Sequence, residues 1–163
     1  MGSRRQSRER ALQILFQWDI HRSSADKGHA DRWLEDFWVQ HPADEDVRGL
    51  AEQLAKGVMA QRSDLDRLIA SHATNWRVDR MPIVDRNILR AALYELLSMP
   101  EVPAKVTVNE AIELAKRFAD DETRKFINGV LDQVLRGDPR LGAKRQEMAA
   151  EAAGTGRQAR GGG

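Results

Sequence analysis

Apolar residues recur every three or four positions along most of the chain, the spacing of one face of an α-helix. In the first such segment, 7–20, they are Ala11, Ile14, Leu15 and Trp18. Comparable stripes predict further helices over 30–40, 44–59 and 83–98, one capped by Ser63, one beginning at Thr107, and one through 126–135. No segment alternates apolar and polar residues as a half-buried strand does. The pattern therefore predicts an all-α fold of about seven helices.

Prolines and capping residues mark several helix boundaries. Pro42 ends the second predicted helix, and Pro82 suits the first turn of a later one, where a missing N–H costs nothing. The run from Thr107 to Glu110 has the form of a capping box, in which hydroxyl and carboxylate satisfy free N–H groups at a helix start. Asp120 and Asp121 complement the positive end of the last long helix.

The helix predicted over 83–98 carries apolar residues around most of its circumference, which is typical of a buried central helix. Arg86 and Arg90 lie four residues apart on its remaining side, and like charges at that spacing disfavour an isolated helix. An acidic partner surface would make the pair tolerable. Simple solvation of both arginines is the alternative.

The helical pattern fades after Gly137. Residues 144–153 predict only a weak helix, and residues 154–163 include five glycines and cannot build a core. We therefore predict one helical domain over 1–138, followed by a tail over 139–163 that is weakly helical and then Gly-rich and disordered.

Composition restricts the chemistry. The chain of 163 residues has no cysteine, which excludes disulfides, thiolate metal sites and cysteine nucleophiles. Lys and Arg total 26 against 25 Asp and Glu, so the net charge of +1 argues against a general nucleic-acid coat, and any basic contact surface must be local. No signal peptide and no run of ~18 apolar residues is apparent, so we expect a soluble, cytoplasmic protein without membrane contact.

No motif indicates catalysis. The four histidines lack helical metal-ligand spacing, and neither a phosphate-binding Walker loop nor a nucleophile elbow occurs. We expect no enzyme activity, no catalytic residue, no metal and no cofactor.

The beginning of the chain is locally basic. The first ten residues contain a single acid, Glu9, and four arginines: Arg4, Arg5, Arg8 and Arg10. On a helix, Arg5, Gln13 and Phe16 lie within about 80° of one another. Guanidinium, amide and ring on one strip suit phosphate contact, base-edge bonding and stacking on single-stranded RNA. A solvated basic turn with Phe16 in the core is the alternative.

Four blocks of sequence, in order, resemble the bacterial NusB family. They are the arginine-rich segment 4–13, the VDRNILRAALYEL segment 84–96, the segment 102–116 with VTVNEAIELAK, and KFINGVLD at 125–132. The blocks span about residue 4 to residue 135.

The resemblance implies two packed helical subdomains and binding to the boxA element of ribosomal RNA leader transcripts. It implies NusE, a ribosomal small-subunit protein, as a partner, and association with RNA polymerase and other Nus factors to suppress premature termination. Carried over by position, the RNA-binding residues are Arg4, Arg5, Arg8, Gln13, Phe16, Glu122, Lys125 and Phe126. The candidates for the NusE side are Asp85, Arg86 and Arg90.

Phe16 stands where many relatives have tyrosine, so stacking is kept while a phenolic hydrogen bond is lost. Exposed aromatic residues could also support a homodimer that masks the arginines. Two rival functions stay open. One is a helical adaptor that binds only protein, and the other is a detached NusB-like domain of an rRNA methyltransferase.

Overall fold

The computed structural model describes residues 3–21, 30–73 and 76–160, without the side chains of residues 30, 31 and 155–160. The elements in chain order are α1 (Ser3–His21), α2 (Ala30–Gln40), α3 (Glu45–His72), η1 (Val78–Arg80), α4 (Ile83–Ser98), α5 (Ala104–Phe118), α6 (Asp121–Gly137), η2 (Pro139–Leu141) and α7 (Gly142–Arg160). Within the described ranges there is no strand, so the predicted all-α fold is confirmed.

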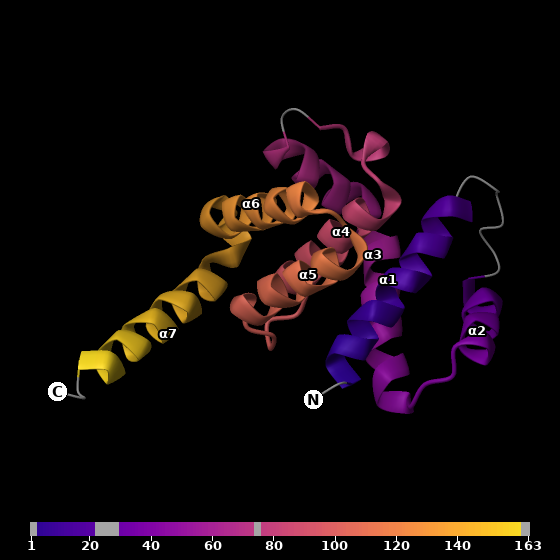
Figure 1. The fold of residues 1–163 in the computed structure, drawn as a ribbon, viewed down its shortest axis with the longest axis horizontal. Coiled ribbons are helices and arrows are strands. Elements are labelled where there is room, and N and C mark those ends of the chain that lie inside the picture. Colours follow the sequence, from indigo (N-terminus) through magenta and orange to yellow (C-terminus); the bar gives the residue numbers. More distant parts are fainter. Residues whose placement is uncertain (1–2, 22–29, 74–75, 161–163) are drawn as a thin grey trace.

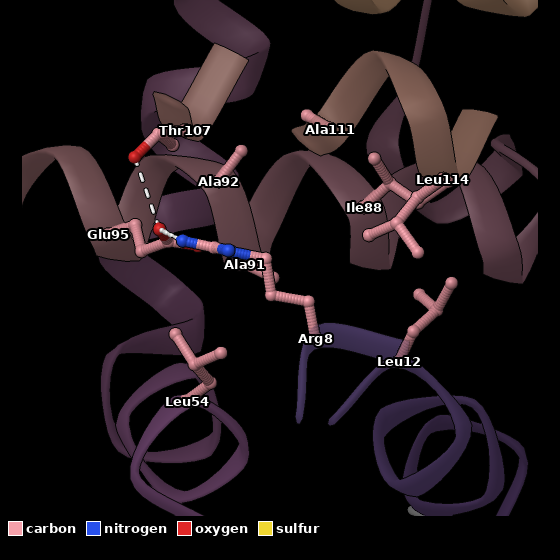
Figure 2. A pocket seen from close by; sticks show the side chains of 10 residues that line it. All are labelled: Arg8, Leu12, Leu54, Ile88, Ala91, Ala92, Glu95, Thr107, Ala111 and Leu114. Carbon is pink, nitrogen blue, oxygen red and sulfur yellow. Dashed lines mark hydrogen bonds and ion pairs between the residues drawn. The ribbon is translucent and has the colours of Figure 1, made fainter. Parts of the chain in front are cut away.

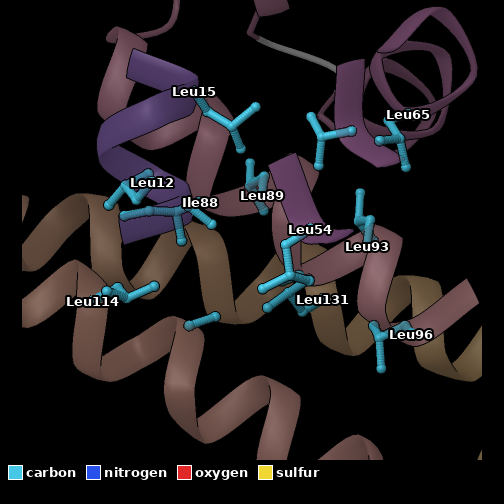
Figure 3. Packing of buried hydrophobic residues seen from close by; sticks show 14 of the residues in the cluster. Leu12, Leu15, Leu54, Leu65, Ile88, Leu89, Leu93, Leu96, Leu114 and Leu131 are labelled. Atoms are coloured by element: carbon cyan, nitrogen blue, oxygen red, sulfur yellow. The ribbon is translucent and has the colours of Figure 1, made fainter. Parts of the chain in front are cut away.

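Helix α4 lies at the centre of the molecule, in contact with α1, α3, α5 and α6 (Figure 1). Helix α1 packs chiefly against α3, and α4 packs against both of them as well as against α5 and α6. A single apolar core lies among these helices, with leucines from α1, α3, α4, α5 and α6 converging on it (Figure 3). Leu89 and Leu93 of α4 are completely buried, which confirms the prediction of a buried central helix.

Two predicted boundaries differ from the structure. The separate helices predicted over 44–59 and from Ser63 form one run, α3, with a kink at Gln61, where φ is −108° and ψ is 15°. Helix α5 begins at Ala104, directly after the extended backbone of Pro103, so Thr107 lies inside the helix and does not cap it. By contrast, Asp120 does cap α6, because its side chain accepts a 2.8 Å hydrogen bond from the Thr123 N–H.

The C-terminal helix α7 extends away from the rest of the molecule (Figure 1). Lys144 lies in the first turn of α7 and is buried. Its ammonium group connects this turn to the preceding helices by donating hydrogen bonds to the carbonyl oxygens of Met99, at 2.8 Å, and of Val102. The helix continues to Arg160, past Gly154, where we expected regular structure to end. Alanine has the highest helix propensity, and four alanines over 149–153 favour this continuation. Residues 161–163 lie outside the described part.

Across the described residues, none of the helices combines the length and apolar character that a membrane crossing requires.

Candidate nucleic-acid interface

The solvent-facing side of α1 carries part of the predicted strip. Arg4 is exposed, and the Arg5 side chain is 55% exposed. Phe16 lies three turns further along with 37% exposure, so its ring is partly open to solvent. Gln13 is half-buried and its side-chain oxygen accepts a 2.9 Å hydrogen bond from Arg10. The structure therefore places a guanidinium and an aromatic ring on the surface of α1, as predicted from the helical spacing.

Arg5 forms an exposed ion pair with Glu110 of α5. Its Nε and Nη2 atoms each lie 3.1 Å from a carboxylate oxygen of Glu110. These hydrogen bonds and the charge of Glu110 raise the pKa of Arg5 above its ordinary value. Exposed pairs of this kind contribute little to stability, typically about 0–1 kcal/mol, so Arg5 can exchange Glu110 for a phosphate at low cost.

Arg8, in contrast, points into the protein. Its Nε and Nη2 atoms donate to Glu95 of α4 at 3.0 Å and 2.6 Å, and the side chain is only 7% exposed. Thr107 of α5 donates to the same carboxylate at 3.1 Å, so Glu95 joins three helices beside a small, mostly apolar cavity (Figure 2). This corrects the expectation that Arg8 faces RNA.

The charge of Arg8 persists in the interior because of its partner. Burial disfavours the charged guanidinium, but the hydrogen bonds and charge of Glu95 outweigh that effect and raise the pKa of Arg8. Arg8 therefore remains a cation, held by α4, and is unavailable to a ligand on the surface of α1.

The arginines of α4 belong to a second buried network. Arg86 donates to Asp19 of α1 at 2.6 Å, and Arg90 donates to the same oxygen at 2.8 Å. Arg90 also forms two hydrogen bonds with Asp66 of α3, at 2.6 Å and 2.8 Å. Asn87 completes the network with a 3.0 Å hydrogen bond to Asp19. The acidic surface that makes the like-charged pair tolerable is thus supplied by this chain itself.

This network determines the ionisation of Asp19. Burial by itself would raise the pKa of this carboxyl, but Arg86, Arg90 and Asn87 together hold it below its ordinary value. Asp19 is therefore a buried carboxylate that two cations keep ionised.

Asp85, the third candidate for the partner side, is also buried. Its carboxylate accepts a 3.2 Å hydrogen bond from the Thr123 hydroxyl of α6, and burial raises its pKa. The structure therefore corrects the expectation that Asp85, Arg86 and Arg90 form a partner-binding face, because none of the three is exposed.

The start of α6 carries the remaining predicted residues. Glu122 and Lys125 are exposed, and Phe126 is half-buried. The Phe126 ring lies against Trp76, with 5.8 Å between ring centroids and an interplanar angle of 49°. The sequence pattern did not indicate Trp76 as a binding residue, because it follows α3 and belongs to no apolar helical stripe.

Ion pairs and hydrogen bonds link α1 to the start of α6 through α5 and α4. Arg117, at the end of α5, pairs with Glu9 of α1, and α6 begins four residues later. In α4, Arg86 donates to Asp19 of α1, and the neighbouring Asp85 accepts from Thr123 of α6. We group the exposed candidates of α1 and α6 with half-buried Phe126 and call them the α1–α6 surface: Arg4, Arg5, Phe16, Glu122, Lys125 and Phe126.

Across the ranges that the structure describes, no three histidine, aspartate or glutamate side chains are grouped so that they could hold a metal ion.

Comparison with known proteins identifies the family. The NusB family model matches residues 5–136. The chain belongs to the NusB family. It is 45% identical over 136 residues to the transcription antitermination protein NusB of Desulforapulum autotrophicum, covering 82% of this chain and 92% of that protein. The NusB protein of Myxococcus xanthus is 43% identical over 138 residues, covering 82% and 95%.

Solved structures show the same NusB-family fold. T. maritima NusB superposes with a TM-score of 0.72 at 34% identity, covering 82% of this chain and 91% of that one. A structure of the antitermination factors NusB and NusE in complex with double-stranded RNA gives a TM-score of 0.70 at 24% identity, covering 83% and 98%. This second likeness concerns the fold alone.

Proposed function

We propose that the protein is a transcription antitermination factor that binds boxA-type RNA of ribosomal RNA leader transcripts together with NusE. In this role it suppresses premature termination by RNA polymerase and acts by positioning RNA and protein, without catalysis. The observation that carries the proposal is the α1–α6 surface, where two linked helices of a NusB-family fold carry exposed cations, exposed Phe16 and half-buried Phe126. The antitermination proteins among its relatives support the same function.

The chemistry of the α1–α6 surface suits an unpaired strand. Arg4 and Lys125 are exposed and make no ion pair within the described ranges, so they can contact phosphates directly. Phe16 and Phe126 each offer part of a ring on which a base can stack. Glu122 can accept hydrogen bonds from amino groups on base edges.

Few cations are available, and the net charge of the chain is only +1. Binding of RNA by the protein alone should therefore be weak, because few counterions are released. A basic partner that also restricts the RNA would raise the affinity, which is the contribution we propose for NusE. Since Asp85, Arg86 and Arg90 are buried, we propose that NusE binds at other residues.

The direct test is fluorescence anisotropy of a labelled boxA RNA, with and without NusE, at two salt concentrations. We expect tight, salt-dependent binding with NusE present and weaker binding without it. Phe16→Ala should weaken binding roughly tenfold, the loss of one stacked base. Arg5→Ala should reduce the slope of log affinity against log salt by about 1.

The matched control is Arg136→Ala. Arg136 is also an exposed arginine paired with a carboxylate, Asp132, but it lies at the far end of α6. Unchanged RNA affinity in both α1 variants, with folding intact, would reject the proposed surface. No binding by the wild-type protein in any condition would favour an adaptor that binds only protein.

A further inference from the structure

Trp76 is the most exposed of the four tryptophans. It is 58% exposed, whereas Trp18 and Trp33 are half-buried and Trp38 is 4% exposed. Its ring contacts that of Phe126 in α6, while more than half of the residue remains open to solvent. A large aromatic ring that packs against one neighbour and is otherwise open to solvent is suited to stacking with a planar ligand.

Two cations without ion pairs accompany these rings. Lys125 precedes Phe126, and Arg80 lies in η1, four residues after Trp76; both are exposed. Neither forms an ion pair within the ranges that the structure describes, whereas Arg77 is paired with Asp79. Lys125 and Arg80 are therefore suited to binding phosphates, and the rings of Trp76 and Phe126 are suited to stacking with bases.

Gly129 adds an independent observation. It lies in the interior of α6, one turn after Lys125 and Phe126, and about 100° per residue places it between their directions on the helix surface. A Cβ atom at Gly129 would meet nothing within 4 Å, so packing does not require glycine there. No described glycine has a positive φ, so backbone conformation does not require it either.

Glycine weakens a helix interior, but it lets another molecule approach the backbone closely, and Gly129 differs from the similarly open Gly49 in lying beside Lys125 and Phe126. The open space beside half-buried Gly129 continues the strip of Glu122, Lys125 and Phe126 by one further turn.

We propose that Trp76 and Phe126 form a second base-stacking site, and that the bound strand passes over the open space beside Gly129. This inference rests on the proposed function, since it requires the protein to bind an unpaired RNA strand. It extends the α1–α6 surface to η1 and assigns roles to Trp76, Arg80 and Gly129. A single-stranded RNA is favoured over a protein ligand because the rings are accompanied by unpaired cations, whereas a protein-binding core is depleted of charge.

Tryptophan emission provides the first test. Titration with unlabelled boxA RNA in the presence of NusE should quench the emission, and RNA should protect the indole from acrylamide. Both effects should be lost in Trp76→Phe and retained in Trp33→Phe, the matched control. Trp76→Ala should weaken RNA binding roughly tenfold by anisotropy, while Trp76→Phe, which keeps a stacking ring, should retain most of the affinity.

Gly129→Ala provides the second test, because stability and binding should change in opposite directions. The alanine should raise the melting temperature by favouring the helix, yet weaken RNA binding several-fold by occupying the space of the strand. Gly49→Ala is the control: Gly49 also lies in a helix with open space around its Cβ position, on α3. It should raise the melting temperature and leave RNA affinity unchanged.

The outcomes distinguish this inference from the function on which it rests. If the wild-type protein binds RNA but Trp76→Ala and Gly129→Ala bind equally well, the second stacking site is wrong and the proposed function stands. If Trp76→Ala loses NusE while its own RNA affinity is unchanged, the rings bind protein and the inference is also wrong. If the wild-type protein binds no RNA, both fail together.

Discussion

Arg5 and Arg8 lie three residues apart in one arginine-rich segment, yet they occupy opposite environments. Arg5 is exposed on α1 and pairs with half-buried Glu110, whereas Arg8 is buried and pairs with buried Glu95. The exposed pair can be exchanged for a ligand at little cost, but the buried pair cannot open without leaving two charges in the interior. One cluster of arginines in a sequence can therefore contain residues that contact a ligand and residues that stabilise the fold. Only their burial in the folded protein distinguishes the two kinds.

The arginines of α4 are a second example of charged side chains that stabilise the fold and do not face solvent. Arg86 and Arg90 are paired with Asp19 and Asp66, so α4 is bound to α1 and α3 by charge as well as by its leucines. We infer that the segment 84–96, which resembles the family so closely, is needed chiefly for the fold. The α1–α6 surface, on which we place RNA binding, contains none of these buried charges.

Among substitutions to alanine, the largest effect is expected from Arg90→Ala. The substitution leaves Asp19 and Asp66 without their shared cation, and removal of one partner of a buried ion pair costs about 3–5 kcal/mol. Urea unfolding followed by circular dichroism measures this loss. Arg80→Ala, at an exposed arginine without an ion pair, should change the free energy of unfolding by less than about 0.5 kcal/mol. Equal stability of the two variants would show that the buried network does not hold the helices.

The same reasoning predicts that Arg90→Glu unfolds the protein, since it places a further acid beside buried Asp19 and half-buried Asp66. A loss of NusE binding in that variant would therefore reflect unfolding of the protein, and not the removal of a direct contact with NusE. Circular dichroism of the purified variant checks this directly, and a native spectrum would contradict it.

A smaller loss, about 3 kcal/mol, is expected from Arg8→Ala, which breaks one buried pair and not two. Arg5→Ala should cost much less, since its side chain is exposed to solvent. RNA affinity should show the reverse order at a temperature where both variants are folded: Arg5→Ala binds more weakly, and Arg8→Ala binds as the wild type does. A folded Arg8→Ala variant with impaired RNA binding would place Arg8 on the recognition surface after all.

Acid should weaken the buried network less than mutation does, because a protonated Asp19 still accepts some of its hydrogen bonds. The pKa of Asp19 is lowered in the folded protein, so its ionised form stabilises the fold above the ordinary aspartate pKa. That contribution is lost as pH falls through the lowered value. We expect the free energy of unfolding to decline in this acidic range. Asp19→Asn should be less stable at neutral pH and should lack this part of the decline.

The smallest effect is expected from Lys125→Ala on α6. Lys125 is exposed and makes no ion pair within the described ranges, so stability should change by less than about 0.5 kcal/mol. If the lysine contacts a phosphate, the slope of log RNA affinity against log salt should fall by about 1. Anisotropy titrations at several salt concentrations measure this slope. An unaltered slope would remove Lys125 from the contact surface.

The sequence by itself determined the local features of this protein. The all-α class, the central buried helix and most helix boundaries follow from the spacing of apolar residues and from prolines and caps, which act within a few neighbours. The same holds for the strip of Arg5 and Phe16 on α1, because two positions on one helix have a known angular relation. The cap expected at Thr107 is wrong because α5 begins at Ala104, and the Thr107 hydroxyl donates instead to Glu95 of another helix.

Only the tertiary structure decided which charged side chains are available to a ligand. Arg8 is buried against a carboxylate 87 residues away, and Arg90 against one 71 residues away. The contact of Trp76 with Phe126 likewise joins distant segments. No periodicity encodes such pairings, since whether a charge is buried or exposed depends on the partner that the folded chain brings to it.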